Sequence, residues 1–383
     1  MPKRGRRHDR PRFLVAITVA VALAGAVHSG AAAQERPQFE TTVEVVQLQV
    51  ALEDDDGDHV VGLGPDDFTL RVEGEPRNLV AVYEVDLGDE EAPREETLPP
   101  AGWRQFLLFF DFTFATRQGV GRAREAALQF IQEATHPLDL VGVATYSRVN
   151  GLRLVVPFTA DHAQARDAVR SFRLERGNHI VDPLGFAVEP LTDLSSPEDE
   201  SAAASGAGAL VDDLLQDAIM QIEQADFRRY RDEVVRYADE LGVLGRMLQA
   251  TRGRKHVVLF SSGFDDKVLT GQSLDELAAD HERMQQNIGE GLAGSSAETR
   301  FGSAELRSSL DAALEQLRMS DSVFHVVDSS GLGQSANRQG LNYLADGTDG
   351  TIAWNRNDLS SALTELAEQT SRFYVLAYRK AED

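Results

Sequence analysis

The sequence predicts an α/β domain with a doubly wound, mostly parallel sheet, preceded by a small antiparallel β module. The continuous apolar run at 106–110, and the runs at 256–260 and 323–327 that are apolar except for one His each, are typical of strands buried on both faces of a parallel sheet. Segments with apolar residues at helical spacing, such as 117–134 and 306–317, stand between these runs. The stretch 40–86 instead alternates apolar and polar residues, which indicates half-buried antiparallel strands. Alternation of strands and helices after residue 103 favours helices on both faces of one sheet.

The first 33 residues read as a signal peptide rather than as part of the fold. Six basic residues precede an apolar and small-residue run from Phe13 to Val27, and Ala31 to Ala33 supply the small residues of a cleavage site. The run is shorter than the roughly 20 residues of a membrane span, although an uncleaved N-terminal anchor is the alternative. We therefore expect an exported protein, periplasmic or extracellular, with no membrane span after signal removal.

Composition excludes several kinds of site and partner. The 383 residues hold 62 Asp and Glu against 38 Lys and Arg, a net charge of −24, and no cysteine. Without cysteine there is no disulfide scaffold, no thiolate-bound zinc and no thiol nucleophile. An acidic protein lacks the excess of Lys and Arg that neutralises phosphates, so no nucleic acid is expected as a partner. Removing the basic signal makes the mature chain more acidic still.

The remaining elements follow in order. The β module covers 40–86, with a turn signal at 73–76, and an acidic, Pro-containing linker covers 87–102. The α/β domain is predicted over 103–383, with further strands at 140–146 and 152–156 and a helix around 165–172. A flexible and helical insertion at about 190–250 interrupts it, and the charged face of 227–240 is expected to face solvent. A helix at 358–370 and a last strand at 373–378 end the domain.

Chemistry in such a sheet is expected in the loop after the first strand, which here runs from Asp111 to Thr116. A carboxylate at Asp111 and a hydroxyl at Thr113 are hard oxygen ligands of the kind that Mg²⁺ prefers. The alternative is that Asp111 and Thr113 cap the following helix and accept hydrogen bonds from loop amides.

From about residue 40 to its end the chain resembles the exported bacterial group of von Willebrand factor type A (VWA) domains. Val60-Val-Gly-Leu-Gly-Pro-Asp-Asp-Phe68 and the turn at 73–76 are similar to the N-terminal module of that group. Gly253-Arg-Lys-His-Val-Val-Leu-Phe-Ser-Ser-Gly-Phe264 resembles its central strand and loop. Residues 137–146, Val327-Asp-Ser-Ser-Gly-Leu332, Leu344-Ala-Asp-Gly-Thr-Asp-Gly350 and the strand at 373–378 complete the resemblance.

The resemblance implies a metal-ion-dependent adhesion site, in a degenerate form. The pattern of the family is Asp-x-Ser-x-Ser, a Thr in a later loop and an Asp after a further strand. Asp111 matches, Thr113 replaces the first Ser, and Ala115 stands at the second Ser and has no ligand atom. Asn178 stands at the Thr position and Ser262 at the last Asp. Asp111, Thr113 and Asn178 would thus form a weak Mg²⁺ site, and no other cofactor is expected.

An enzymatic alternative uses some of the same residues. Haloacid-dehalogenase-like, Mg²⁺-dependent phosphatases place an Asp nucleophile after the first strand, a Ser or Thr later and then paired acids. Asp111, Ser261 or Ser262, and Asp265 with Asp266 fit that order. The general acid two residues after the nucleophile is replaced by Thr113, which cannot donate a proton in this way. The sequence therefore favours a non-enzymatic VWA-like protein that acts in adhesion or protein–protein interaction. Its expected contact loops hold Asp111, Asn178, Asp182 and Ser262, and the protein partner is not specified by the sequence.

Overall fold

The computed structural model describes residues 45–54, 59–88, 102–172, 206–271, 301–331, 338–354, 356 and 358–380. Within 206–224 it describes the backbone, with a side chain at 221 only. The predicted signal peptide, most of the acidic linker, and residues 173–205 with Asn178 and Asp182 lie outside these ranges.

The central sheet has six strands, five of them parallel. Apolar side chains fill both of its faces because the strands are almost continuously apolar, and β5 and β8 are buried along their whole length. Only the hairpin strand at the end of the series, β7, runs antiparallel to its neighbour. In spatial order the strands are β10 (Ile352–Ala353), β9 (Ser322–Asp328), β8 (Lys255–Ser261), β5 (Gln105–Asp111), β6 (Leu140–Ser147) and β7 (Gly151–Thr159). The predicted α/β class with a mostly parallel sheet is confirmed.

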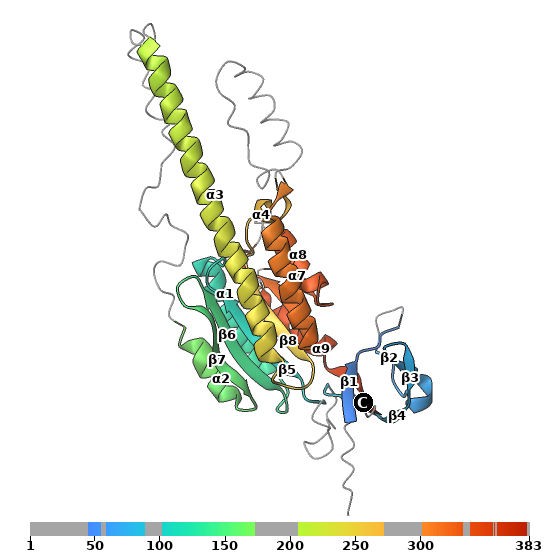
Figure 1. The fold of residues 1–383 in the computed structure, drawn as a ribbon. Coiled ribbons are helices and arrows are strands. Elements are labelled where there is room, and N and C mark those ends of the chain that lie inside the picture. The colour runs from blue at the N-terminus through green and yellow to red at the C-terminus, as the bar shows by residue number, and fades with distance from the viewer. Residues whose placement is uncertain are drawn as a thin grey trace, which may run out of the picture. The chain divides into compact units, whose positions relative to one another are not determined.

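Helices cover both faces of this sheet (Figure 1). Leu107 and Phe109 point into one core, whereas Phe106, Leu108 and Phe110 point into the other, as the strand period of two requires. The first core is closed by α3 (Gly206–Leu248), α4 (Lys267–Thr270), α7 (Ala304–Met319) and α8 (Arg338–Asp346). The second is closed by α1 (Arg117–Gln129), a π-helical turn η3 (Phe130–Ala134), α2 (His162–Arg170) and α9 (Leu359–Gln369).

A second, three-stranded antiparallel sheet corrects the predicted place of the last strand. In it β11 (Arg372–Arg379) lies between β1 (Val45–Val50) and β4 (Leu79–Asp86), so the strand predicted at 373–378 completes the N-terminal module rather than the parallel sheet. An apolar run has the same pattern in the centre of either kind of sheet, which is why the sequence did not separate the two. The module also holds η1 (Pro65–Asp67) and a hairpin of β2 (Leu70–Val72) and β3 (Glu75–Arg77) at the predicted turn.

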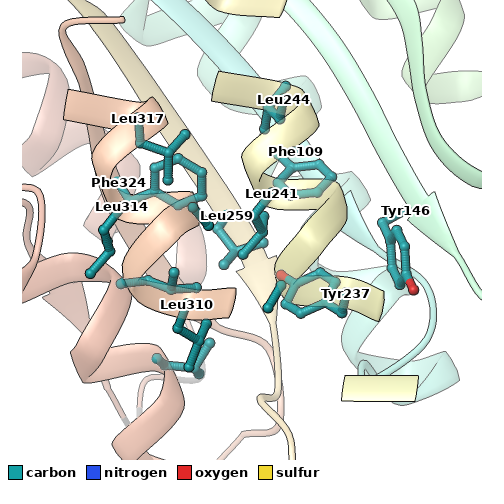
Figure 2. Close-up of a cluster of buried hydrophobic side chains, with 14 of the residues drawn as sticks. Phe109, Tyr146, Tyr237, Leu241, Leu244, Leu259, Leu310, Leu314, Leu317 and Phe324 are labelled. Atoms are coloured by element: carbon teal, nitrogen blue, oxygen red, sulfur yellow. The ribbon is translucent and has the colours of Figure 1, made fainter. Parts of the chain in front are cut away.

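The C-terminal part of helix α3, over 234–248, covers the sheet rather than standing apart from it. Figure 2 shows Tyr237, Leu241 and Leu244 of α3 beside three leucines of α7, all facing Phe109, Leu259 and Phe324 of the strands. The charged face of 227–240 is exposed at Asp232, Arg236 and Asp239, as predicted, but Glu233 is buried. Over 234–248, the helical part of the predicted insertion is thus a core element.

Among the described residues, no helix is long and apolar enough to cross a membrane.

Candidate functional site at the carboxyl edge of the sheet

The candidate site lies where the strand order changes direction. The first strand of the sheet, β5, is flanked by β6 on one side and β8 on the other, and ligands of open α/β sheets bind outside the carboxyl ends of strands at such a point. Asp111 is the last residue of β5, Ser261 the last of β8 and Asp328 the last of β9. The topology therefore places Asp111 beside Ser261, the residue before Ser262.

Asp111 is completely buried and holds the loop that follows it. Its Oδ2 accepts a hydrogen bond from Ser261 Oγ at 2.6 Å, and its Oδ1 accepts from the amides of Thr113 at 2.9 Å and Phe114 at 3.1 Å. Helix α1 is capped by Thr116 instead, whose Oγ1 accepts from the Gly119 amide at 3.0 Å. Of the capping alternative, the bonds from loop amides are found at Asp111 but not at Thr113, and neither residue caps α1.

Burial dominates the electrostatics of Asp111. It raises the pKa of this carboxyl to about 6, and the hydrogen bonds from Ser261, Phe114 and Thr113 offset only part of that rise. The Glu233 carboxylate of α3 raises the pKa slightly further. Burial therefore disfavours the ionised form of Asp111, despite the three hydrogen-bond donors around it.

The oxygen ligands that the described residues offer at this edge do not fit an Mg²⁺ site. Thr113 Oγ1 is buried without a hydrogen-bond partner among the described residues, so one carboxylate and one hydroxyl are available at this edge. Ser262 is half-buried and its Oγ lies 3.1 Å from Ser329 Oγ. Mg²⁺ prefers near-octahedral oxygen coordination, usually with more than one charged or phosphate ligand. In the described part of the chain, no group of three or more His, Cys, Asp or Glu side chains could hold a metal ion.

The two acids of the phosphatase alternative are engaged elsewhere. Asp266 accepts hydrogen bonds from the amides of Arg338 at 3.1 Å and Gln339 at 2.8 Å, at the start of α8. Asp265 Oδ1 accepts from the Lys267 amide at 2.9 Å, in the first turn of α4. Both side chains therefore accept hydrogen bonds from backbone amides in the first turn of a helix.

Residues of α3 that the sequence did not single out cover this edge. The Phe114 ring packs edge-on against Tyr237 and Tyr230, with ring centroids 5.4 Å and 6.2 Å apart. Tyr146, the neighbour of Asp111 on β6, packs 4.9 Å from Tyr237. Glu233, with 5% of its surface exposed, lies 3.5 Å from Arg148 in the loop after β6.

The sequence offered one weak signal for this cover. Tyr230, Glu233 and Tyr237 are three and four residues apart and so share one helix face, but the same segment is full of charges typical of an exposed helix. Nothing in the spacing distinguishes the buried Glu233 from its exposed neighbours.

Comparisons with known proteins give similarity of structure only. No protein-family model and no curated protein matches the chain. Among solved structures, an aerotolerance-related membrane protein from Bacteroides fragilis shares 9% identity over 70% of this chain and 98% of its own, with a TM-score of 0.33. BatB from Bacteroides thetaiotaomicron shares 10% identity over 70% and 97%, with a TM-score of 0.34. The pilus adhesin SpaC from Lactobacillus rhamnosus GG shares 10% identity over 77% and 34%, with a TM-score of 0.38. Identities and TM-scores this low carry no conclusion about what this chain does.

Proposed function

We propose that this is an exported, non-enzymatic, VWA-like protein that binds a partner protein at the carboxyl edge of its six-stranded sheet. The observation that carries the proposal is the state of Asp111, the carboxylate where the sheet changes direction. It is fully buried, accepts three hydrogen bonds and has Thr113 where a general acid would stand. A nucleophile needs access to substrate and an acid–base partner, and among the described residues Asp111 has neither.

The surroundings of this edge support binding rather than chemistry. Serine hydroxyls follow both β8 and β9, with Ser262 and Ser330 half-buried and Asp265 exposed. Such loops, held by a rigid sheet, are common sites of protein contact. The net charge of −24 argues against nucleic acid and favours a partner with basic side chains.

Site-specific photo-crosslinking tests where a partner binds. A photoreactive amino acid replaces Asp265, after β8, or Arg252, before β8; both residues are exposed, and they lie at opposite ends of the same strand. We expect a discrete crosslinked protein, in the exported fraction of the source cells, from position 265 and none from position 252. Equal crosslinking at both ends would contradict the proposed surface.

Phosphatase activity and metal binding have direct assays. We expect the mature protein to show no turnover of a generic phosphomonoester with Mg²⁺ above that of Asp111→Asn. Turnover that Asp111→Asn abolishes would replace the binding proposal with the phosphatase alternative. Calorimetric titration with Mg²⁺ or Mn²⁺ should show no micromolar binding, and such binding lost in Asp111→Ala would restore the metal site.

A further inference from the structure

The first half of helix α3 extends beyond the helix that packs beside it. Two α3 glycines face α7, Gly242 at Ala313 and Gly245 at Gln316. Both pairs are 71 residues apart in the sequence, so the two helices run in the same direction and Ala304, the first residue of α7, is level with residue 233. The α3 turn of Phe227 and Tyr230 still packs on the main apolar cluster. Residues 206–226 therefore continue the helix past both, over about 30 Å (Figure 1).

This part of α3 has an apolar stripe of its own. Val211, Leu215, Ala218 and Ile222 are spaced by four and three residues, which places them on one face of the helix. That face lies about a third of a turn away from the face that the later turns of α3 bury over the sheet. The stripe is therefore not a continuation of the buried face. Because packing of an amphipathic face supplies most of the stability of a helix, the stripe requires a neighbour other than the sheet or α7.

The charge of the same segment indicates what kind of neighbour fits. Residues 206–226 hold five acidic residues and no Lys or Arg. A second copy of the chain would bring five more acidic residues alongside them. Residues 272–300, which connect α4 to α7 along the chain, hold six acidic residues against two arginines. Like charges that flank a helix pair repel each other, whereas a helix flanked by Lys and Arg is complementary to this one.

We propose that residues 206–226 of α3 bind a basic amphipathic helix of a partner protein. The apolar face of the partner helix packs on the stripe, and its Lys and Arg side chains lie beside the acidic residues of α3. Helix α3 leads into β8 and runs opposite to it, so its first half lies at the carboxyl edge of the sheet. The proposal rests on the proposed function only in that the protein binds a partner protein, because this contact needs none of the loops at that edge.

Titration of the mature protein with synthetic helical peptides tests the chemistry of the partner. One labelled peptide of four heptads has Leu at the a and d positions and Lys at e and g, and the comparison peptide has Glu in place of every Lys. We expect micromolar binding of the Lys peptide by fluorescence anisotropy, weakened by added salt, and no binding of the Glu peptide. Failure of both peptides to bind, or equal binding of the two, would overturn the proposal.

Charged substitutions on two faces of the same helix locate the binding surface. Leu215→Asp and Ile222→Asp each place a charge in the stripe, whereas Gln216→Asp and Gln224→Asp add the same charge away from it. We expect at least a tenfold loss of affinity for the Lys peptide in each stripe variant and less than a twofold change in each control. A similar result for all four variants would show that net charge alone attracts the peptide, which would contradict the proposal.

A second variant keeps the stripe intact and tests the acidic residues. Asp212→Asn combined with Glu223→Gln removes two charges from the segment without changing an apolar position. This double variant should bind the Lys peptide several-fold more weakly and with a smaller dependence on salt. Affinity and salt dependence equal to those of the unaltered protein would contradict the assigned charge complementarity.

Two measurements on the protein alone would assign the stripe to another neighbour. We expect a monomer in sedimentation analysis, and a dimer that Ile222→Asp dissociates would assign the stripe to a second copy. Leu215→Cys and Leu277→Cys are the only cysteines of a double variant. A disulfide between them within one chain would assign the stripe to residues 272–300. Peptide binding does not depend on position 265, so a negative crosslinking result there would leave this proposal standing.

Discussion

Asp111 shows at the residue scale how a charge at the centre of a site can weaken the fold. Its pKa is raised from 3.8 to about 6, so the folded protein binds this proton more tightly than the unfolded chain does. Stability is therefore lost as the pH rises through that window, and above pH 6 the buried carboxylate costs about 1–3 kcal/mol. Asp111→Asn keeps the Oδ1 acceptor for the Thr113 and Phe114 amides and removes the charge.

We therefore expect Asp111→Asn to raise the free energy of unfolding at pH 7.5 by about 1–3 kcal/mol, measured by urea denaturation. Asp111→Ala is the matched control and should lower it, because Ser261 Oγ and two amides lose their acceptor. A loss of stability in Asp111→Asn comparable to that in Asp111→Ala would show that the charge itself holds the loop.

Among the residues at this edge, the sequence singled out those at the strand ends and missed those on α3. Asp111, Thr113 and Ser262 are placed by strand ends, and strand ends follow from apolar runs that are read directly. Glu233 and Tyr237 reach the same edge through the path of a helix more than 100 residues away along the chain. Burial of one charged residue among many is decided by tertiary packing, which local pattern does not encode. Asn178 and Asp182 stay predictions, since they lie outside the described residues.

The sequence predicts whether a segment is a helix or a strand more readily than it predicts which elements that segment pairs or packs with. The helical spacing at 306–317 and the apolar run at 256–260 correspond to α7 and β8. The run at 373–378 is a strand, but its partners are β1 and β4, because pairing depends on where the chain returns rather than on its composition. Helix α3 has the charges of an exposed insertion and nonetheless packs along α7 through two glycines, Gly242 and Gly245.

These two glycines give a matched test of that packing. A Cβ at Gly245 would lie 2.7 Å from the Gln316 carbonyl carbon, whereas one at Gly242 would lie 3.7 Å from Ala313 Cα, an ordinary contact. Both Ala substitutions gain about 1 kcal/mol of helix propensity. We expect Gly242→Ala to be neutral or stabilising and Gly245→Ala to destabilise by about 1–3 kcal/mol, measured by urea denaturation. Equal effects would show that the helices separate at little cost.

At the scale of the whole molecule, a buried histidine pair joins the neighbouring parallel strands β8 and β9. His256 Nδ1 lies 3.1 Å from His325 Nε2, and His325 Nδ1 lies 2.9 Å from Thr351 Oγ1. One ring nitrogen must donate and the other accept, so the pair excludes two charged rings. Burial lowers the pKa of both, that of His325 to about 3, and the nearby cations Arg254 and Arg104 lower the pKa of His256 further.

Both rings therefore stay neutral in the folded protein at a pH where the unfolded chain, with a His pKa of about 6.5, takes up protons. The pair should leave the free energy of unfolding unchanged above pH 7 and lower it as the pH drops from 6.5 toward 3, by up to about 1.4 kcal/mol per pH unit for each ring.

Asp111 changes stability in the opposite direction over part of this range, so a substitution in the pair is needed to separate the two contributions. His256→Asn keeps a polar group near the Nδ1 position and removes one titrating ring. Urea denaturation between pH 4.5 and 7.5 should then show a slope shallower by about one proton, with no change in slope above pH 7. An unchanged slope would mean that His256 is not held neutral by the fold, because a ring that titrates alike in both states contributes nothing to the pH dependence.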